Sequence, residues 1–262
     1  MEQNTAFFFP FLAVYFSLYS ILGNMTNQAD SLSIILPIFN ERERIVLGVQ
    51  KALELAEQWP SETEIILVDD GSNDGGIEQL SAPVLERITV LYIEHQGKGA
   101  AVQAGVLAAR MQRILFSDID WSVPIEQILS MLLLEDKLII ASREIKGARR
   151  IAEPPWRHVL GKIFNRWVQW MLLSGYEDTQ CGCKIFDGDL AHRIFSQVKE
   201  KGWAFDVEVL LLAHLYGIHV REVPVSWQYQ THSKITLVQD GIAMAQAVLR
   251  IKKRLLQGEY RF

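Results

Sequence analysis

Two carboxylates stand one residue apart directly after a short apolar run in the middle of the chain. Residues 114–116 are apolar, and after one serine come Asp118 and Asp120. Two anions at the end of a buried segment repel each other unless a cation lies between them. Carboxylate oxygens are the ligands that Mg²⁺ and Mn²⁺ prefer. We therefore predict that Asp118 and Asp120 share a divalent metal ion, although one of them could instead cap the helix expected after Pro124.

Two other apolar runs also end in acidic side chains. Residues 33–37 lead to the Asn-Glu pair at 40–41, and residues 64–68 lead to the Asp-Asp pair at 69–70. Because ligands of open parallel sheets bind beyond the carboxyl ends of the strands, these side chains are expected to meet at one edge. A turn after the second run explains part of this pattern, since Asp, Gly and Ser are turn residues, but a turn does not require both aspartates.

The elements that must position these side chains alternate along the chain. Apolar runs predict strands, and segments with apolar residues at helical spacing predict helices. Strands are expected at 33–37, 64–68, 89–93, 114–116, 138–141 and 219–225, and helices at 42–59, 99–111, 124–134, 157–174, 205–216 and 236–256. This order predicts an α/β, Rossmann-like fold with a mostly parallel central sheet flanked by helices. We find no linker, so residues 31–262 are expected to form one domain.

The composition is that of a globular protein. Of the 262 residues, 49% are hydrophobic and 22% are charged, which excludes a disordered chain. The two cysteines, Cys181 and Cys183, are too close in sequence for an ordinary disulfide, and no second pair completes a zinc site. They therefore indicate a reducing compartment.

The net charge of −5 conceals two halves of opposite sign. Residues 1–142 carry 8 Lys and Arg against 19 Asp and Glu, whereas residues 143–262 carry 18 against 12. An acidic half suits a cation, and a basic half suits phosphate groups or an anionic membrane surface. The helices expected at 157–174 and 236–256 are basic and amphipathic, as interfacial helices are, although core packing produces the same pattern. Nothing in the sequence predicts a nucleic-acid partner.

The N-terminal segment, residues 1–30, also has an unusual composition. Residues 3–29 contain no charged side chain, and residues 6–22 are almost wholly apolar without the basic region of a secretory signal. Such a run is at the short end of the roughly 17–25 residues that span a bilayer. It is expected to be a membrane anchor or an interfacial helix, unless translation begins at Met25.

Nine short segments, in this order along residues 32–258, resemble glycosyltransferase family 2 with the GT-A fold. The resemblance is to its polyprenyl-phosphate members, first to the dolichyl-phosphate β-glucosyltransferases and then to the mannosyltransferases. The segments are PIFNE (37–41), VDDGSND (68–74), GKGAAVQAG (97–105), SDID (117–120), ASR (141–143), DTQCGCKIF (178–186), WAFDVEVL (203–210), EVPVSW (222–227) and HSKI (232–235).

The resemblance implies an inverting transferase that moves a hexose onto a polyprenyl phosphate such as dolichyl or undecaprenyl phosphate. Glucose from UDP-glucose is the expected donor, Mg²⁺ or Mn²⁺ the expected cofactor, and the cytoplasmic face of a membrane the expected location. A divalent cation would neutralise the diphosphate leaving group as a Lewis acid.

The resemblance also assigns residues to the donor. Pro37, Phe39 and Glu41 match the loop that packs around the base and ribose, and Asp70, with Asp69 in a lesser part, matches the carboxylate that recognises the base. Asp118 and Asp120 are the expected metal ligands, with Asp120 also counted as catalytic. Lys98 could belong to a phosphate cradle, or the glycines beside it could only begin a helix.

On the acceptor side, an ionised phosphate needs no general base, but it needs positive charge to hold it beside an anionic donor. Arg143 and Arg157 match positions expected to grip phosphate, with Lys184 and Lys234 as weaker candidates. Carboxylates are expected to line the sugar and acceptor side of the pocket. They are Asp178 and Asp206, while Glu208 could line it or only brace the site by pairing with an arginine.

Three other functions remain open at this point. The donor could be GDP-mannose, or the acceptor could be a growing polysaccharide. The protein could also be a catalytically silent nucleotide-sugar-binding partner, although Asp70, Asp118 and Asp120 argue against that. A Rossmann dehydrogenase is disfavoured because no G-x-G-x-x-G follows the first predicted strand.

Overall fold

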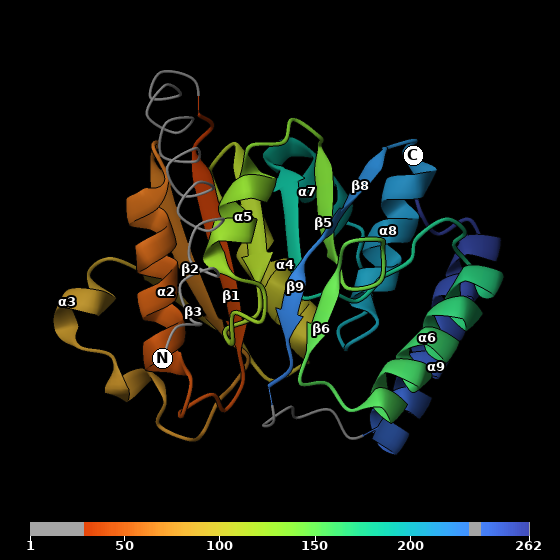
Figure 1. The fold of residues 1–262 in the computed structure, drawn as a ribbon, viewed down its shortest axis with the longest axis horizontal. Coiled ribbons are helices and arrows are strands. Elements are labelled where there is room, and N and C mark those ends of the chain that lie inside the picture. The colour runs from red at the N-terminus through yellow and green to blue at the C-terminus, as the bar shows by residue number, and fades with distance from the viewer. Residues whose placement is uncertain (1–28, 231–236, 262) are drawn as a thin grey trace, which may run out of the picture.

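A seven-stranded sheet in the order β3-β2-β1-β4-β7-β5-β8 runs through the centre of the molecule (Figure 1). The computed structural model describes residues 29–230 and 237–261. The sheet consists of β1 (Leu32–Ile38), β2 (Thr63–Asp69), β3 (Thr89–Tyr92), β4 (Arg113–Ser117), β5 (Leu138–Ser142), β7 (Cys183–Asp187) and β8 (Val220–Pro224). The pairs β1–β2, β1–β4, β2–β3 and β5–β8 are parallel. The predicted α/β fold with a mostly parallel sheet is confirmed.

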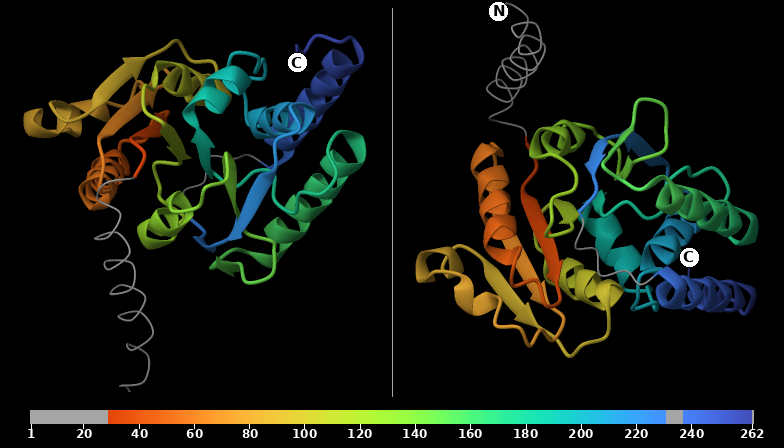
Figure 2. Two further views of the ribbon diagram at one scale, coloured as in Figure 1. Left: turned by 90° about the horizontal axis from the view of Figure 1, so that it is seen from above. Right: turned by 60° about the horizontal axis from the view of Figure 1, so that its bottom comes forward.

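Helices cover both faces of the sheet (Figure 2). They are η1 (Ile77–Gln79), α2 (Ile45–Gln58), α3 (Ala82–Leu85), α4 (Lys98–Ala108), α5 (Ile125–Leu132), α6 (Pro155–Met171), α7 (Gly188–Phe195), α8 (Phe205–Leu215) and α9 (Leu237–Leu256). Within β1, Ile34 packs with α2 and α5, whereas Ile35 packs with α4, α7 and α8 on the opposite face. This alternation is the side-chain period of a strand, and it produces two apolar layers, one on each side of the sheet.

The sequence-based prediction missed β7, which lies between β4 and β5 and runs antiparallel to both. Its five residues include Lys184, a charged side chain that is fully buried at the second position of the strand. A lysine interrupts the apolar pattern that predicts a buried strand, because burying an unpaired charge is unfavourable. Lys184 is tolerated here because its ammonium pairs with Asp206 at 2.7 Å.

The basic segment after β5 leads into a second, two-stranded sheet. There β6 (Arg149–Ile151) pairs in parallel with β9 (Ser226–Gln228). Strands this short carry too little periodicity to be recognised in a sequence. The small sheet brings the basic segment after β5 against Trp227, which follows β8.

Helices α6 and α9 lie side by side at one end of the molecule, beyond β8 (Figures 1 and 2). Val168 of α6 and Val248 of α9 join the core, but much of the remaining apolar surface of α6 faces outward. Trp156, Ile163 and Trp170 are 52%, 61% and 79% exposed. Among the described residues, no helix is long and apolar enough to cross a bilayer. The predicted anchor at 1–30 lies almost entirely outside the described residues.

Candidate functional site

A cavity of about 500 Å³ opens at the carboxyl ends of β1, β2 and β4. It brings together ten of the predicted site residues, which come from segments distributed over most of the chain. They are Pro37, Phe39, Glu41, Asp70, Lys98, Asp118, Asp120, Arg143, Arg157 and Asp206. The cavity is therefore where an open α/β sheet is expected to bind its ligand.

One wall of the cavity is built around Asp70, which is almost fully buried. Its two carboxylate oxygens accept hydrogen bonds from the main-chain N–H groups of Gln96 and Gly97, each at 2.8 Å. His95 lies 2.9 Å from the same carboxylate and stacks on Phe39, with ring centroids 4.0 Å apart. Asp70 thereby fixes the loop before α4 and creates a flat aromatic surface that suits a nucleotide base.

Asp69, by contrast, does not line the cavity. Its carboxylate accepts a hydrogen bond from the N–H of Ser72 at 2.9 Å, as an aspartate in a turn does. Glu41 does line the cavity, and it forms a two-point ion pair with Arg44 at 2.6 and 2.8 Å. The Arg44 guanidinium also lies 3.9 Å from Asp120, and so links the wall at Glu41 to the acidic pair.

Asp118 and Asp120 are held in a tight turn after β4. Trp121 adopts a left-handed backbone conformation with φ of 48°, and its indole N–H donates to the carbonyl of Gly48 in α2 at 2.8 Å. A side chain at Gly48 would approach the carbonyl of Ile119 to 2.5 Å, so only glycine allows α2 to lie this close. The strain of the turn is thus offset by packing against α2.

The environment of the acidic pair fits a divalent cation. Burial and the charge of Asp118 raise the pKa of Asp120, against hydrogen bonds from Ser122. A side chain at Gly182 would place its first carbon 1.9 Å from Asp118 Oδ2, so glycine keeps the space beside that carboxylate open. Among the described residues, no cluster of three or more His, Cys, Asp or Glu completes a metal site. Mg²⁺ commonly takes only one or two protein carboxylates together with substrate phosphates, so two aspartates facing a cavity are a fitting donor set.

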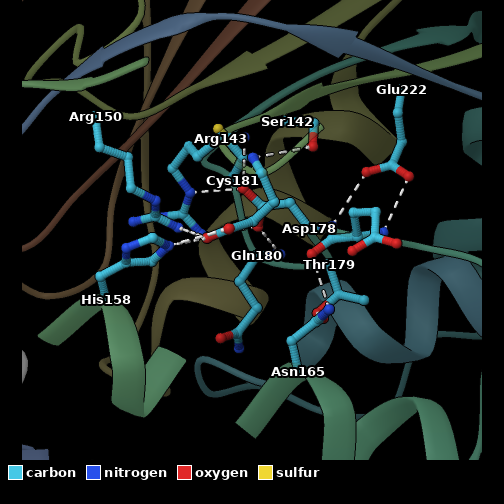
Figure 3. A network of polar contacts seen from close by, with 12 residues as sticks. Ser142, Arg143, Arg150, His158, Asn165, Asp178, Thr179, Gln180, Cys181 and Glu222 are labelled. Atoms are coloured by element: carbon cyan, nitrogen blue, oxygen red, sulfur yellow. Dashed lines mark hydrogen bonds and ion pairs between the residues drawn. The ribbon is translucent and has the colours of Figure 1, made fainter. Parts of the chain in front are cut away.

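On the opposite side, Arg143 at the end of β5 reaches the cavity with its guanidinium fixed from behind (Figure 3). Its Nε and Nη2 donate to the two oxygens of Asp178 at 2.7 and 2.8 Å. Burial alone would raise the pKa of Asp178. The charge of Arg143 outweighs burial and lowers this pKa to about 2. The main-chain N–H of Asp178 in turn donates to Glu222 of β8 at 3.1 Å.

Asp178 was expected to line the cavity, but in the structure it does not reach the cavity. Asp178 is 4% exposed and lies behind Arg143, because a buried carboxylate is stable only with a partner for each oxygen. A network around it connects α6 to this loop and to the segment after β5 (Figure 3). Thr179 donates to Asn165 of α6 at 2.9 Å, and Glu144 lies 3.0 Å from His158, also on α6.

Arg157, in the first turn of α6, completes the cationic side of the cavity. Its Nη1 donates to the hydroxyl of Tyr229 at 2.8 Å, and its guanidinium lies 5.3 Å from the centre of that ring. Trp227 of β9 lies in the same way against the Arg143 guanidinium, at 5.3 Å. Aromatic rings thus orient both arginines toward the cavity, as cation–π contacts do.

Four further candidates lie deeper in the fold or outside the described residues. Asp206 lines the cavity and pairs with Lys184, which does not. Glu208 braces the C-terminus: its carboxylate is fully buried and accepts from Tyr260 at 2.6 Å and from Arg254 at 3.3 Å. Lys234 lies outside the described residues.

Sequence reasoning missed several residues that line the cavity. They are His95, Arg44, Glu153, Gln180, Trp203, Trp227 and Tyr229. Trp203 and Trp227 lie inside segments already singled out, and aromatic residues at the ends of strands and helices are a usable signal. His95 stands two residues before the Gly-Lys-Gly segment and carries no local signal.

Comparison with known proteins agrees with this geometry. The family model "Glycosyl transferase family 2" matches residues 33–166. The chain is 31% identical to the dolichyl-phosphate beta-glucosyltransferase of Saccharomyces cerevisiae, over 92% of this chain and 80% of that one. It is 30% identical to the human protein of the same name, over 94% and 81%.

Among solved structures, the fold is similar to that of glucosyl-3-phosphoglycerate synthase from Mycobacterium tuberculosis, crystallised with Mn²⁺, UDP and glucosyl-3-phosphoglycerate. The TM-score is 0.65 at 14% identity, and the match covers 96% of this chain and 85% of that one. At this identity the likeness concerns the fold alone. The family match and the identity to the yeast and human enzymes together show that this chain belongs to glycosyltransferase family 2, with the GT-A fold.

Proposed function

We propose that the protein transfers glucose from UDP-glucose to a polyprenyl phosphate, with inversion at the anomeric carbon. The observation that carries this proposal is that one cavity is lined both by the acidic pair Asp118 and Asp120 and by the cationic pair Arg143 and Arg157. The relatives' name, dolichyl-phosphate beta-glucosyltransferase, supports the sugar and the class of acceptor.

The donor is expected to bind with its base against Phe39 and His95. The ring pair offers a stacking surface beyond the carboxyl ends of β1 and β2, and Asp70 holds that surface in place. Glu41, on the same wall, is placed to accept hydrogen bonds from the ribose hydroxyls. With the base there, the diphosphate is expected to lie toward Lys98 and Asp118, where β4 ends.

Asp118 and Asp120 would hold Mg²⁺ or Mn²⁺, which supplies charge neutralisation to the diphosphate when bound. Arg44 and Ser122 keep the Asp120 carboxylate oriented, at 3.9 and 2.9 Å. The chain's contribution would thus be to hold two carboxylates in a fixed arrangement for the metal ion before the reaction begins.

The acceptor phosphate would bind Arg143 and Arg157. Arginine offers a planar fork that matches two phosphate oxygens, and Asp178 removes the freedom of the Arg143 fork. A phosphate oxygen then attacks the anomeric carbon, the bond to the UDP oxygen breaks, and UDP leaves with the electron pair. Because the acceptor is already ionised, no side chain has to remove a proton.

A lipid acceptor requires access to a membrane, and α6 is the element that we expect to provide it, on the cytoplasmic face. Arg157 lies in its first turn at the cavity, and the same helix exposes large apolar side chains along its length. They are Trp156, Val159, Leu160, Ile163 and Trp170. Lys162 is also well exposed, although its ammonium lies 3.2 Å from Glu144, which reduces the charge it offers to an anionic surface. In α9, Arg250 and Arg254 pair with Glu200, which reduces the outward charge predicted there.

The test is a panel of donors and acceptors. Purified protein is incubated with Mn²⁺ and labelled UDP-glucose or GDP-mannose, together with a polyprenyl phosphate or the unphosphorylated polyprenol as a matched control. Sugar moved into the organic phase is counted. Transfer from UDP-glucose to the phosphate only is the expected result.

Transfer from GDP-mannose alone would keep the mechanism and replace the sugar. Donor binding without any lipid product, from either donor, would contradict the proposal. It would favour a polysaccharide acceptor or a silent binding protein.

A further inference from the structure

The ammonium of Lys98 occupies a cation site at the edge of the acidic pair. Its Nζ lies 2.6 Å from Asp118 Oδ1 and over two aromatic rings, 5.3 Å from the centre of Phe116 and 5.2 Å from that of Trp203. Only 14% of the lysine side chain is exposed. A carboxylate and two ring faces form a cage that favours a positive charge.

A second anion stabilises the charge in this cage. Asp206 is buried and acts on Lys98 from below, while its own ion pair is with Lys184 at 2.7 Å. A lysine is ordinarily charged at neutral pH, and here its ammonium contacts Asp118 directly. The cage therefore holds a cation when the cavity is empty.

The backbone that carries Lys98 is fixed, so any movement belongs to the side chain. Gly97 has a φ of 116°, and a side chain there would come within 2.7 Å of the carbonyl of Lys201. The N–H of Gly97 donates to Asp70, and the N–H of Ala100 donates to the carbonyl of Lys201 at 3.1 Å. A long, flexible chain on a rigid turn can swing its ammonium between nearby partners without a change of fold.

The position of Lys98 conflicts with the role of Asp118. A divalent ion shared by Asp118 and Asp120 would lie within a few ångströms of the ammonium, where two cations repel. We propose that Lys98 is a resident counter-ion of Asp118, which the metal ion can displace efficiently only when the donor diphosphate arrives to take the ammonium. This inference rests on the proposed function, because it assumes a metal ion and a diphosphate in this cavity.

The consequence is coupled binding. Without nucleotide, the metal ion must compete with an ammonium for Asp118, so it binds weakly. With the diphosphate present, Lys98 pairs with phosphate oxygens and leaves Asp118 to the metal ion. Coupling free energies are reciprocal, so the metal ion must tighten nucleotide binding by the same factor. The cavity would thus remain neutralised when empty and bind metal and donor as a pair.

The experiment measures Mn²⁺ affinity from the electron paramagnetic resonance signal of the free ion, with and without saturating UDP. The proteins are wild type, Lys98→Met, Lys98→Arg and the control Lys201→Met, whose ammonium contacts Gln103 instead of the acidic pair. We expect Lys98→Met to bind Mn²⁺ without UDP about tenfold more tightly than wild type, since one competing charge is gone. UDP should then tighten Mn²⁺ much less than in wild type.

Lys98→Arg keeps the charge and should keep weak binding without UDP, and Lys201→Met should match wild type throughout. Equal Mn²⁺ affinities of wild type and Lys98→Met without UDP would overturn the inference and leave the proposed function intact. No Mn²⁺ binding by any protein, even with UDP, would overturn both. Circular dichroism spectra identical to wild type establish that each variant is folded.

Discussion

Two ion pairs face the same cavity and differ in which partner is turned toward it. In the pair of Lys98 and Asp118, the carboxylate is 35% exposed and the cation is 14% exposed. In the pair of Arg143 and Asp178, the carboxylate is 4% exposed and the cation is 18% exposed. The first pair has one contact, through a flexible ammonium, and the second has a planar two-point contact closed by a main-chain N–H.

The difference indicates that the two ion pairs have different roles. A carboxylate that faces the cavity is available to a new cation, so the pair at Asp118 can exchange partners. A carboxylate behind an arginine cannot reach a ligand, and its effect is to hold the guanidinium in one orientation. The acidic pair on the donor side is therefore expected to lower the stability of the folded protein while it provides a binding site. The pair of Arg143 and Asp178 on the acceptor side is expected to raise that stability.

The largest expected effect is on the donor side of the cavity, at the acidic pair. Asp120→Asn removes one of two metal-binding charges and should lower transfer by about 10³-fold, since metal stabilisation of the leaving group supplies several kcal/mol. The same change should raise the free energy of unfolding at neutral pH, because burial and Asp118 make the ionised form of Asp120 unfavourable, as its raised pKa indicates. Transfer into the organic phase and urea unfolding measure the two effects. An active Asp120→Asn protein at saturating Mn²⁺ would contradict the metal assignment.

The next effect is on the acceptor side of the cavity, where a substitution should lower the free energy of unfolding instead of raising it. Asp178→Asn leaves Arg143 buried without its counter-charge, and breaking a buried pair costs about 3–5 kcal/mol in unfolding free energy. Urea unfolding should show this loss beside the gain in Asp120→Asn. Glu57→Gln is the control, because its pair with Arg87 is exposed and should contribute little. Equal stability of Asp178→Asn and wild type would remove the contrast between the two pairs.

The pH dependence of stability sharpens the same contrast. The pKa of Asp178 falls from an ordinary 3.8 to about 2 in the folded protein. Its pair therefore contributes stability above about pH 4, an estimated ~2 kcal/mol, and loses it as the pH falls through about 2. The difference in unfolding free energy between wild type and Asp178→Asn should shrink from pH 6 to pH 2. A constant difference across this range would mean that the charge of Asp178 is not what stabilises it.

The smallest effect concerns the orientation of Arg157. Tyr229→Phe removes the hydroxyl that accepts from its guanidinium but keeps the ring. We expect the KM for the polyprenyl phosphate to rise about fivefold, in keeping with one hydrogen bond of about 1 kcal/mol, with the KM for UDP-glucose unchanged. A rise in the KM for UDP-glucose instead would contradict the assignment of Tyr229 to the acceptor side of the cavity.

Much of the donor side could be predicted from the sequence, because its residues follow strands that can be recognised locally. Asp118 and Asp120 stand directly after an apolar run, and the parallel order places them beside Asp70. In the structure these side chains line one cavity. The metal itself and the roles of the residues remain predictions.

The acceptor side could be predicted less well, because it depends on long-range partners. Nothing near Asp178 in the sequence indicates that Arg143, 35 residues earlier, takes both of its oxygens. The antiparallel strand β7 was missed because Lys184 breaks its apolar pattern, and only the fold supplies the buried partner, Asp206. Short strands β6 and β9 likewise depend on tertiary pairing.

The most direct test of the contrast is a crystal structure of the protein with Mn²⁺ and UDP. We predict Mn²⁺ on Asp118 and Asp120, with the Lys98 ammonium moved beyond about 4 Å from Asp118, the limit of an ion pair, and onto the diphosphate. We also predict that Arg143 keeps both contacts to Asp178. The contradicting result is a structure in which Lys98 remains on Asp118 while Arg143 leaves Asp178.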